Sequence, residues 1–134
     1  MIDFQFFKTP PVPLPNIKVW LENVVAEEGK MIGDITFIFC SDEYLLQKNI
    51  EFLNHETLTD VIAFDYSKNI QISGDIFISI DRVKENAKIF QETFLTELNR
   101  VMVHGLLHLL GYKDKTKKNA KQMREKENFY LLKI

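Results

Sequence analysis

Apolar residues recur along the chain at two different spacings, which predict where helices and strands form. In residues 16–29, NIKVWLENVVAEEG, five apolar residues recur every three or four positions, as on one face of an amphipathic helix. Asn16 is a candidate N-terminal cap for this helix, and Gly29 a candidate stop. Ser41 is placed to cap a second helix over residues 42–54.

Short β-rich runs lie between these helical patterns. Residues 2–7, IDFQFF, form the first, and the prolines that follow exclude regular structure. Residues 33–41, GDITFIFCS, are nearly continuously apolar, as in a strand that is buried on both faces. Residues 59–67 and 74–80 are two further runs separated by polar residues, and we expect them to form neighbouring strands.

The rest of the chain has a helical pattern. Residues 81–110 keep helical spacing without a break, but thirty residues exceed the usual length of a globular helix. We therefore expect a kink or short turn near residues 91–93. Gly111 ends this region, Thr116 is a candidate cap, and residues 117–132 follow as a final helix.

This order of elements predicts an α+β fold in which a small mixed β-sheet is covered by helices, with a helical layer formed by the C-terminal part. The chain has 134 residues, of which 46% are hydrophobic and 27% charged, as is ordinary for a globular protein with a real core. We therefore expect one domain over residues 1–134.

The chain has no stretch that approaches the roughly 20 apolar residues needed to span a bilayer. Its first residues carry Asp3 and several prolines where a signal peptide would have its apolar centre. The single cysteine, Cys40, has no partner within the chain for a disulfide, which agrees with a reducing compartment. We expect a cytoplasmic protein without a membrane partner, in which Cys40 is a small buried hydrophobic residue.

Positive charge is concentrated in one segment, although the net charge of the chain is −2. Residues 113–126 hold seven basic residues against two acids. A polyanion would therefore bind here rather than over the whole surface. The alternative is a solvated, lysine-rich helix face, which the charges alone favour.

Two of the three histidines, His104 and His108, lie four residues apart in HGLLHLLGYKDKT. On a helix this spacing puts both rings on one face, where they can bind one metal ion, or can be hydrogen-bonded core or surface residues. Gly111 can end the helix, and Asp114 follows three residues later. The resulting pattern, HxxxHxxGxxD, has the offsets of the metzincin zinc motif with an aspartate as third ligand.

Gly105 stands where zinc proteases of the HExxH type have their glutamate general base. Peptide hydrolysis by that mechanism is therefore disfavoured. Lysines flank Asp114, and both metals and lysines stabilise the negative charge that develops on phosphate oxygens. The pattern favours a phosphodiester substrate.

Several motifs in order resemble the YbeY family of bacterial rRNA maturation factors. VHGLLHLLGYKD resembles the family's HGxLHLxGYDH, TDVIAF at 59–64 resembles TDVLSF, and GDIFIS at 74–79 resembles the family's GDI strand. Met123 and Glu127 fit the tail of the motif. The resemblance implies a metal-dependent, single-strand-specific endoribonuclease that acts in 16S rRNA 3′-end processing and ribosome quality control. Its implied partners are rRNA and the small ribosomal subunit.

Carried over from the family, His104, His108 and Asp114 become the ligands of one divalent ion, with zinc as our first expectation. Asp114 replaces the usual histidine, and an oxygen ligand widens the choice of metal toward manganese or iron. Leu53 stands where the family usually has an arginine. His55 and Arg100 are substitute catalytic candidates; an exposed turn residue and a structural salt bridge are their respective alternatives.

We expect four lysines beside the metal site to contact the RNA backbone: Lys113, Lys115, Lys117 and Lys118. The second hypothesis is a non-catalytic ribosome-assembly or RNA-binding factor in which the metal is structural. A zinc protease is a third hypothesis, which Gly105 disfavours. Nothing in the sequence indicates an oligomeric state.

Overall fold

The computed structural model describes residues 1–53 and 59–134, and these residues form a four-stranded sheet with five helices. The predicted elements are all confirmed, with bounds that differ by a few residues. In chain order they are β1 (Ile2–Phe7), α1 (Ile17–Glu27), β2 (Met31–Cys40), α2 (Asp42–Leu53), β3 (Val61–Asp65), β4 (Gln71–Ser79), α3 (Ile80–Ile89), α4 (Phe94–Leu109) and α5 (Lys117–Leu131).

The sheet is mixed, as expected, and its strands lie in the order β1-β2-β4-β3. Strands β1, β2 and β4 are parallel, whereas β3 runs antiparallel to β4. The central strand β2 pairs Phe37 with Phe4 of β1 and with Ile76 of β4. Strands β3 and β4 are therefore neighbours, and β2 and β4 are covered on both edges, which agrees with their apolar sequences.

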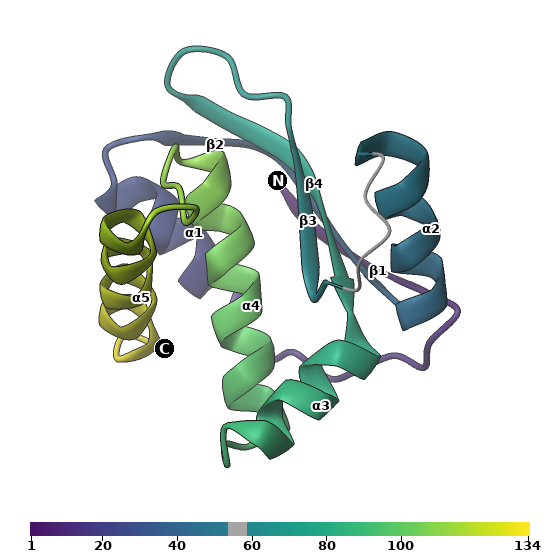
Figure 1. Cartoon of the computed structure of the whole chain (residues 1–134). Helices are drawn as coiled ribbons and strands as arrows, with labels where there is room; N and C mark the ends of the chain where they lie inside the picture. Colours follow the sequence, from purple (N-terminus) through teal and green to yellow (C-terminus); the bar gives the residue numbers. More distant parts are fainter. Residues whose placement is uncertain (54–58) are drawn as a thin grey trace.

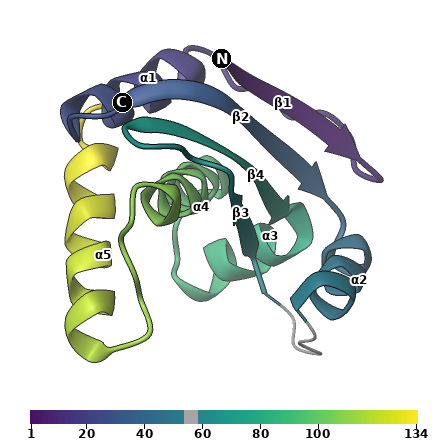
Figure 2. The same ribbon diagram turned by 90° about the horizontal axis from the view of Figure 1, so that it is seen from above.

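Helices cover both faces of the sheet (Figures 1 and 2). Side chains alternate between the faces along a strand, so that Ile76 and Ile78 belong to the main core while Phe77 packs in a smaller cluster with Leu45 of α2. Helix α4 contacts β3 and β4 on the main-core face, and α1 and α5 lie on the same side. Helix α4 thus lies between the sheet and α5.

Gly105 lets α4 approach the sheet closely. A Cβ atom at this position would lie 2.7 Å from Ile76 Cγ2 and 3.3 Å from Val61 Cγ2, and Ile76 is fully buried. Position 105 therefore faces β3 and β4, and no side chain fits there without moving the helix. In this chain, the position that holds a glutamate in HExxH proteases therefore packs against the sheet.

The predicted break in the long helical segment is present between α3 and α4. Gln91 has a φ of 55°, and Thr93 Oγ1 then accepts a hydrogen bond from the Thr96 amide at 3.1 Å, which caps α4. Ser41 and Thr116 cap α2 and α5 in the same way.

Asn16 differs from the expectation at the start of α1. It occupies the cap position, but with a φ of 60° and no hydrogen bond from its side chain to the helix. The turn after the proline-rich segment holds Asn16 in the left-handed region, which asparagine adopts more readily than most residues.

Cys40 is fully buried, as expected, and burial raises the pKa of its thiol to about 12. A thiol with this pKa is a poor nucleophile at neutral pH. None of the helices within the described ranges combines the length and apolarity needed to cross a bilayer.

Candidate metal centre

Helix α4 presents His104 and His108 at the border between its buried face and solvent. Nine residues of this helix are buried, whereas both histidines are partly exposed. Their rings lie one helical turn apart, with centroids 4.7 Å from each other. The spacing of four residues therefore brings the two imidazoles together on one face, as predicted.

The chain reverses after α4 and brings a carboxylate back to this pair. Gly111 has a φ of 101°, and the amides of Gly111 and Tyr112 bond to the carbonyl oxygens of His108 and Leu107. This is the Schellman arrangement that ends many helices. It confirms Gly111 as the stop, and it directs the following residues toward Asp114.

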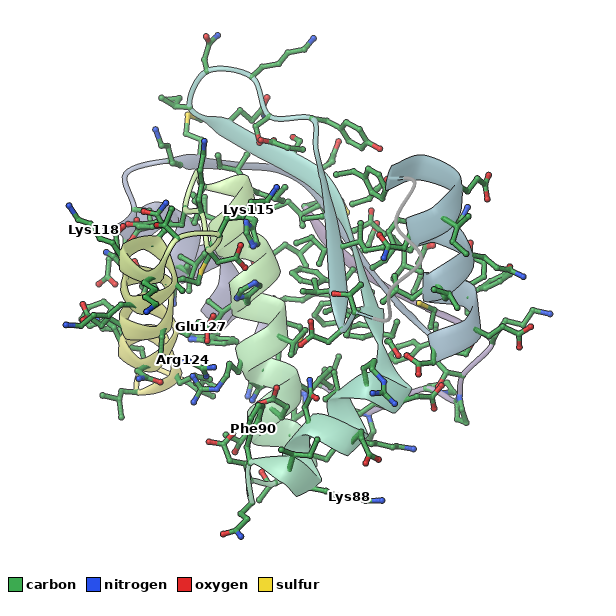
Figure 3. The ribbon with its side chains drawn as sticks, viewed as in Figure 1. Lys88, Phe90, Lys115, Lys118, Arg124 and Glu127 are labelled. Atoms are coloured by element: carbon green, nitrogen blue, oxygen red, sulfur yellow. The ribbon has the colours of Figure 1, made fainter. Side chains whose placement is uncertain are left out.

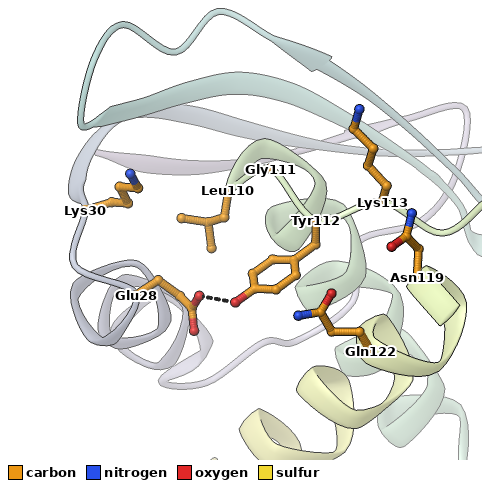
Figure 4. A pocket seen from close by; sticks show the side chains of 8 residues that line it. All are labelled: Glu28, Lys30, Leu110, Gly111, Tyr112, Lys113, Asn119 and Gln122. Atoms are coloured by element: carbon orange, nitrogen blue, oxygen red, sulfur yellow. Dashed lines mark hydrogen bonds between the residues drawn. The ribbon is translucent and has the colours of Figure 1, made fainter.

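Tyr112 fixes this turn from the other side. Its hydroxyl donates a hydrogen bond of 2.6 Å to Glu28 Oε1, at the end of α1 (Figure 4). Glu28 Oε2 also accepts hydrogen bonds from Lys126 at 3.1 Å and from the Tyr130 hydroxyl, both on α5. Although partial burial opposes it, these donors lower the pKa of Glu28, so the carboxylate stays charged and holds α1, α5 and the turn together.

Three side-chain atoms converge after this turn. The distances are 3.1 Å from His104 Nε2 to His108 Nε2, 3.2 Å from His104 Nε2 to Asp114 Oδ2, and 3.3 Å from His108 Nε2 to Asp114 Oδ2. A tetrahedral zinc ion with bonds of about 2.0–2.1 Å separates its ligand atoms by about 3.3 Å. The triangle therefore has the size that one such ion requires.

Glu127 of α5 determines which nitrogen of His104 faces the site. Its Oε2 lies 2.6 Å from His104 Nδ1. Because a carboxylate only accepts hydrogen bonds, Nδ1 carries the proton, and in the neutral imidazole Nε2 then has the lone pair directed at His108 and Asp114. Metal-binding histidines are commonly held in this way by a second carboxylate.

The electrostatics of the cluster also favour a cation. Burial lowers the pKa of His104, but the hydrogen bond and charge of Glu127, with Asp114 and Asp60, raise it overall. The pKa of His108 is lowered by burial and by its neighbour His104. Negative charge therefore surrounds the two imidazoles, and the lowered pKa of His108 favours the neutral form of that ring.

Asp60, which precedes β3, belongs to the same surroundings. Burial raises the pKa of its carboxyl group, although the charge of His104 opposes this. Its Oδ2 accepts a hydrogen bond of 3.3 Å from Asn86 of α3. Asp60 thus adds a third acid beside Asp114 and Glu127.

Two cavities meet at the converging side chains. One, of 340 Å³, runs between α3, α4 and α5, and the other, of 540 Å³, runs along β3. Both are lined by Asp60, His104 and Asp114. Helix α4 therefore forms the floor of an open cleft, in which His104 and Asp114 line both cavities and His108 lines the one along β3.

The donor set fits a divalent ion. Among the described residues, the histidine pair and Asp114 are the one group of three potential ligands within 4.8 Å of one another. Structural zinc sites are normally closed by four protein ligands, whereas catalytic sites use three and leave a position open. Two imidazoles, one carboxylate and an open cleft match the second type.

The other predicted site residues are distributed differently. Arg100 donates a hydrogen bond of 2.8 Å to Asn128 Oδ1 and lies 3.4 Å from Glu127 Oε1, so it braces the carboxylate that holds His104. These contacts are the salt bridge weighed as its alternative, and a catalytic role for Arg100 stays a prediction. His55 lies outside the residues that the structure describes.

The four predicted lysines are all exposed, but they lie on different sides of the turn. Lys115 lines the 540 Å³ cavity beside the histidine pair. Lys113 instead lines a separate cavity of 350 Å³, together with Glu28 and Tyr112 (Figure 4). Lys117 and Lys118 form the first turn of α5.

Sequence reasoning did not identify the roles of Glu127, Asp60 and Glu28. Glu127 and Asp60 fall in the motifs that carry the family resemblance, and this was the available signal for both. No local sequence pattern indicated the role of Glu28, because its partner Tyr112 is 84 residues away in the chain.

Replacing Glu127 by glutamine is expected to weaken metal binding by about 10- to 100-fold, because the amide no longer fixes the His104 tautomer as a carboxylate does. The measurement is a competition titration against a chromophoric chelator. Glu125→Gln is a matched control on the exposed side of α5 and should bind metal as the unmodified chain does. Equal affinity in both variants would contradict the role of Glu127.

The site geometry defines a class of protein: a small α+β protein in which three candidate metal ligands converge in an open cleft, on a helix and the turn that follows it. Comparisons with known proteins specify the family. The family model described as endoribonuclease YbeY matches residues 8–134. The chain therefore belongs to the endoribonuclease YbeY family.

Individual relatives agree. The chain is 54% identical to the endoribonuclease YbeY of Flavobacterium johnsoniae over 109 residues, which cover 81% of this chain and 78% of that protein. It is 45% identical to that of Amoebophilus asiaticus over 133 residues, covering 96% and 90%. The solution structure of TM1509 from Thermotoga maritima superposes with a TM-score of 0.68 at 34% identity, covering 98% of this chain and 87% of that one.

Proposed function

We propose that this protein is a metal-dependent endoribonuclease that hydrolyses phosphodiester bonds in single-stranded RNA. The observation that carries the proposal is the triangle of His104 Nε2, His108 Nε2 and Asp114 Oδ2, with sides of 3.1 to 3.3 Å, in an open cleft. Membership of the endoribonuclease YbeY family supports RNA as the substrate. The hypotheses of a non-catalytic assembly factor and of a zinc protease receive no support from the relatives.

We further propose that the substrate is rRNA on the small ribosomal subunit, in 16S rRNA 3′-end processing and ribosome quality control. We also propose that the protein acts in the cytoplasm and as one domain over residues 1–134. The proposal rests on the family and on the basic segment beside the cleft.

His104, His108 and Asp114 would hold one divalent ion, for which zinc is our first choice because two imidazoles and a carboxylate are an established zinc set. When bound, the ion supplies Lewis acidity to water and to a phosphate oxygen. Asp60, Asp114 and Glu127 place negative charge at the cleft, which would repel a phosphate on its own. The acids therefore make RNA binding depend on the cation.

Lys115, Lys117 and Lys118 would bind the RNA backbone next to this centre. Thr116 caps α5, and the first turn of the helix holds two lysines and no acid. Positive side chains are unfavourable at a helix N-terminus, where anions are stabilised. Helix stability thus does not explain these lysines, whereas contact with phosphate does.

Replacing Lys115, Lys117 and Lys118 by glutamine is expected to weaken binding of single-stranded RNA and to reduce its salt dependence. Each lost phosphate contact lowers the slope of log K against log salt by about 0.7, so the slope should fall by about 2. Fluorescence anisotropy at several salt concentrations measures this.

A matched triple variant serves as the control. Lys8, Lys18 and Lys84 are also exposed, and they lie neither in the turn after α4 nor in the first turn of α5. Their replacement by glutamine makes the same change in net charge. If both triple variants lose the same salt slope, the lysines near Asp114 contribute only through overall charge, and the proposed contact is wrong.

A further inference from the structure

Phe90 is an exposed aromatic residue at the end of the cleft farthest from Lys115. It follows α3 directly, and 53% of its surface is exposed. Its amide donates to the Asn86 carbonyl oxygen at 2.9 Å, so the end of the helix holds the backbone in place. Figure 3 shows Phe90 on the side of α4 where Arg124 and Glu127 of α5 lie.

Other exposed phenylalanines have partners that Phe90 lacks. Phe7 lies 4.5 Å from the Tyr44 ring, and Phe129 packs on Tyr130 with Lys133 4.3 Å above it. Within the described parts of the chain, the Phe90 ring has neither an aromatic neighbour nor a cation above it. One face of a large, flat, apolar side chain is thus available at the wall of the cleft.

The cavity beside Phe90 leads to the metal centre. Its 340 Å³ are lined by Phe90 at one end and by His104 and Asp114 at the other, with Met123 and Arg124 along one wall. This volume is within the usual range of sites for small organic groups. From Glu97 to His104 the floor extends seven residues of α4, or about 10 Å, which a few nucleotides of a single strand can bridge.

The inner wall is polar and incompletely hydrogen-bonded. Glu97 lines the cavity with only 3% of its surface exposed, and within the described residues its Oε1 has no hydrogen-bond partner. Arg100 Nε is 3.9 Å away, too far for a hydrogen bond. Because this oxygen is itself buried, a ligand in the cavity does not reach it, and the exposed polar group on this wall is the Arg124 guanidinium, whose side chain is 55% exposed.

We propose that Phe90 and Arg124 form a nucleobase-binding subsite, in which one unpaired base of the RNA stacks on the Phe90 ring next to the Arg124 guanidinium. Aromatic rings and guanidinium groups are the usual partners of splayed bases in single-stranded RNA. A base within a duplex is stacked on both of its faces and paired along one edge, so its faces are not available to the Phe90 ring. The subsite rests on the proposed RNA cleavage, and it makes that cleavage selective for single strands.

The test compares Phe90→Ala, Phe90→Trp and the control Phe129→Ala in metal-loaded, full-length protein. Because Phe90→Ala removes the stacking of one base, it should raise the Kd and the KM for a single-stranded RNA decamer by about 5- to 100-fold. The kcat should change less than the KM. Phe90→Trp should bind like the unmodified protein, and Phe129→Ala should not differ from it. Thermal unfolding of each variant checks that the fold is retained.

A decamer of the same backbone with abasic residues separates base stacking from other effects. Phe90→Ala and the unmodified protein should bind it equally, because no base remains to stack. Equal losses on both decamers, or no loss on the normal one, would overturn the subsite. If the unmodified protein binds but does not cleave RNA, the proposed function fails, while the anisotropy measurements still decide the subsite.

Discussion

A variant in which both His104 and His108 are replaced by alanine is expected to contain no bound metal above background and to cleave single-stranded RNA at least about 1,000-fold more slowly. Metal-assisted charge stabilisation contributes several kcal/mol to such reactions, and each 1.4 kcal/mol is a factor of ten. Removing both imidazoles leaves Asp114 as a single ligand. Elemental analysis and a cleavage assay on the same preparations measure the two effects.

The two measurements have to change together. Glu125→Gln, prepared in the same way, should keep both the metal and the activity. Cleavage that persists in the double alanine variant would come from a contaminating nuclease or from a site elsewhere in the chain. Metal that persists at one ion per chain would remove the histidine pair from the ligand set.

Asp114 is expected to determine both metal retention and the pH range of activity. Asp114→Ala should lower metal affinity at least about 100-fold, as a directly bound ligand contributes more than the residues that orient it. Asp114→His should keep the metal, because three imidazoles are a known zinc set. An ion with three neutral ligands is formally more positive, so it acidifies water more strongly than one that is bound by a carboxylate.

The direction of the pH effect follows from this difference in charge. Activity that requires a deprotonated water should rise at lower pH in Asp114→His than in the unmodified protein, by about one pH unit. Initial cleavage rates between pH 5 and 9 at saturating zinc measure the acidic limb of the profile. An unchanged limb, or a shift toward higher pH, would show that the Asp114 carboxylate does not act on the metal.

Local patterns predicted the histidine pair and the turn, because helical periodicity and the left-handed preference of glycine operate over a few residues. His104, His108, Gly111 and Asp114 lie within eleven positions, so their spacing defines their geometry. The break before Thr93 was also predictable, since it rests on helix length and a local cap.

Contacts between distant parts of the chain were not predictable in this way. Glu127 lies 23 residues from His104 on another helix, and its hydrogen bond exists only because α5 packs beside α4. The position of Phe90 at the cleft likewise depends on how α3 and α5 flank α4. Gly105 was interpreted through the missing glutamate, while the structure shows a packing reason, the contact with Ile76.

The most direct test of the account is a crystal structure of the zinc-loaded protein with anomalous diffraction recorded at the zinc edge. The account predicts one strong peak, bonded to His104 Nε2, His108 Nε2 and Asp114 Oδ2, with the fourth position taken by water. A peak bonded elsewhere, or a fourth protein ligand that closes the site, would contradict it.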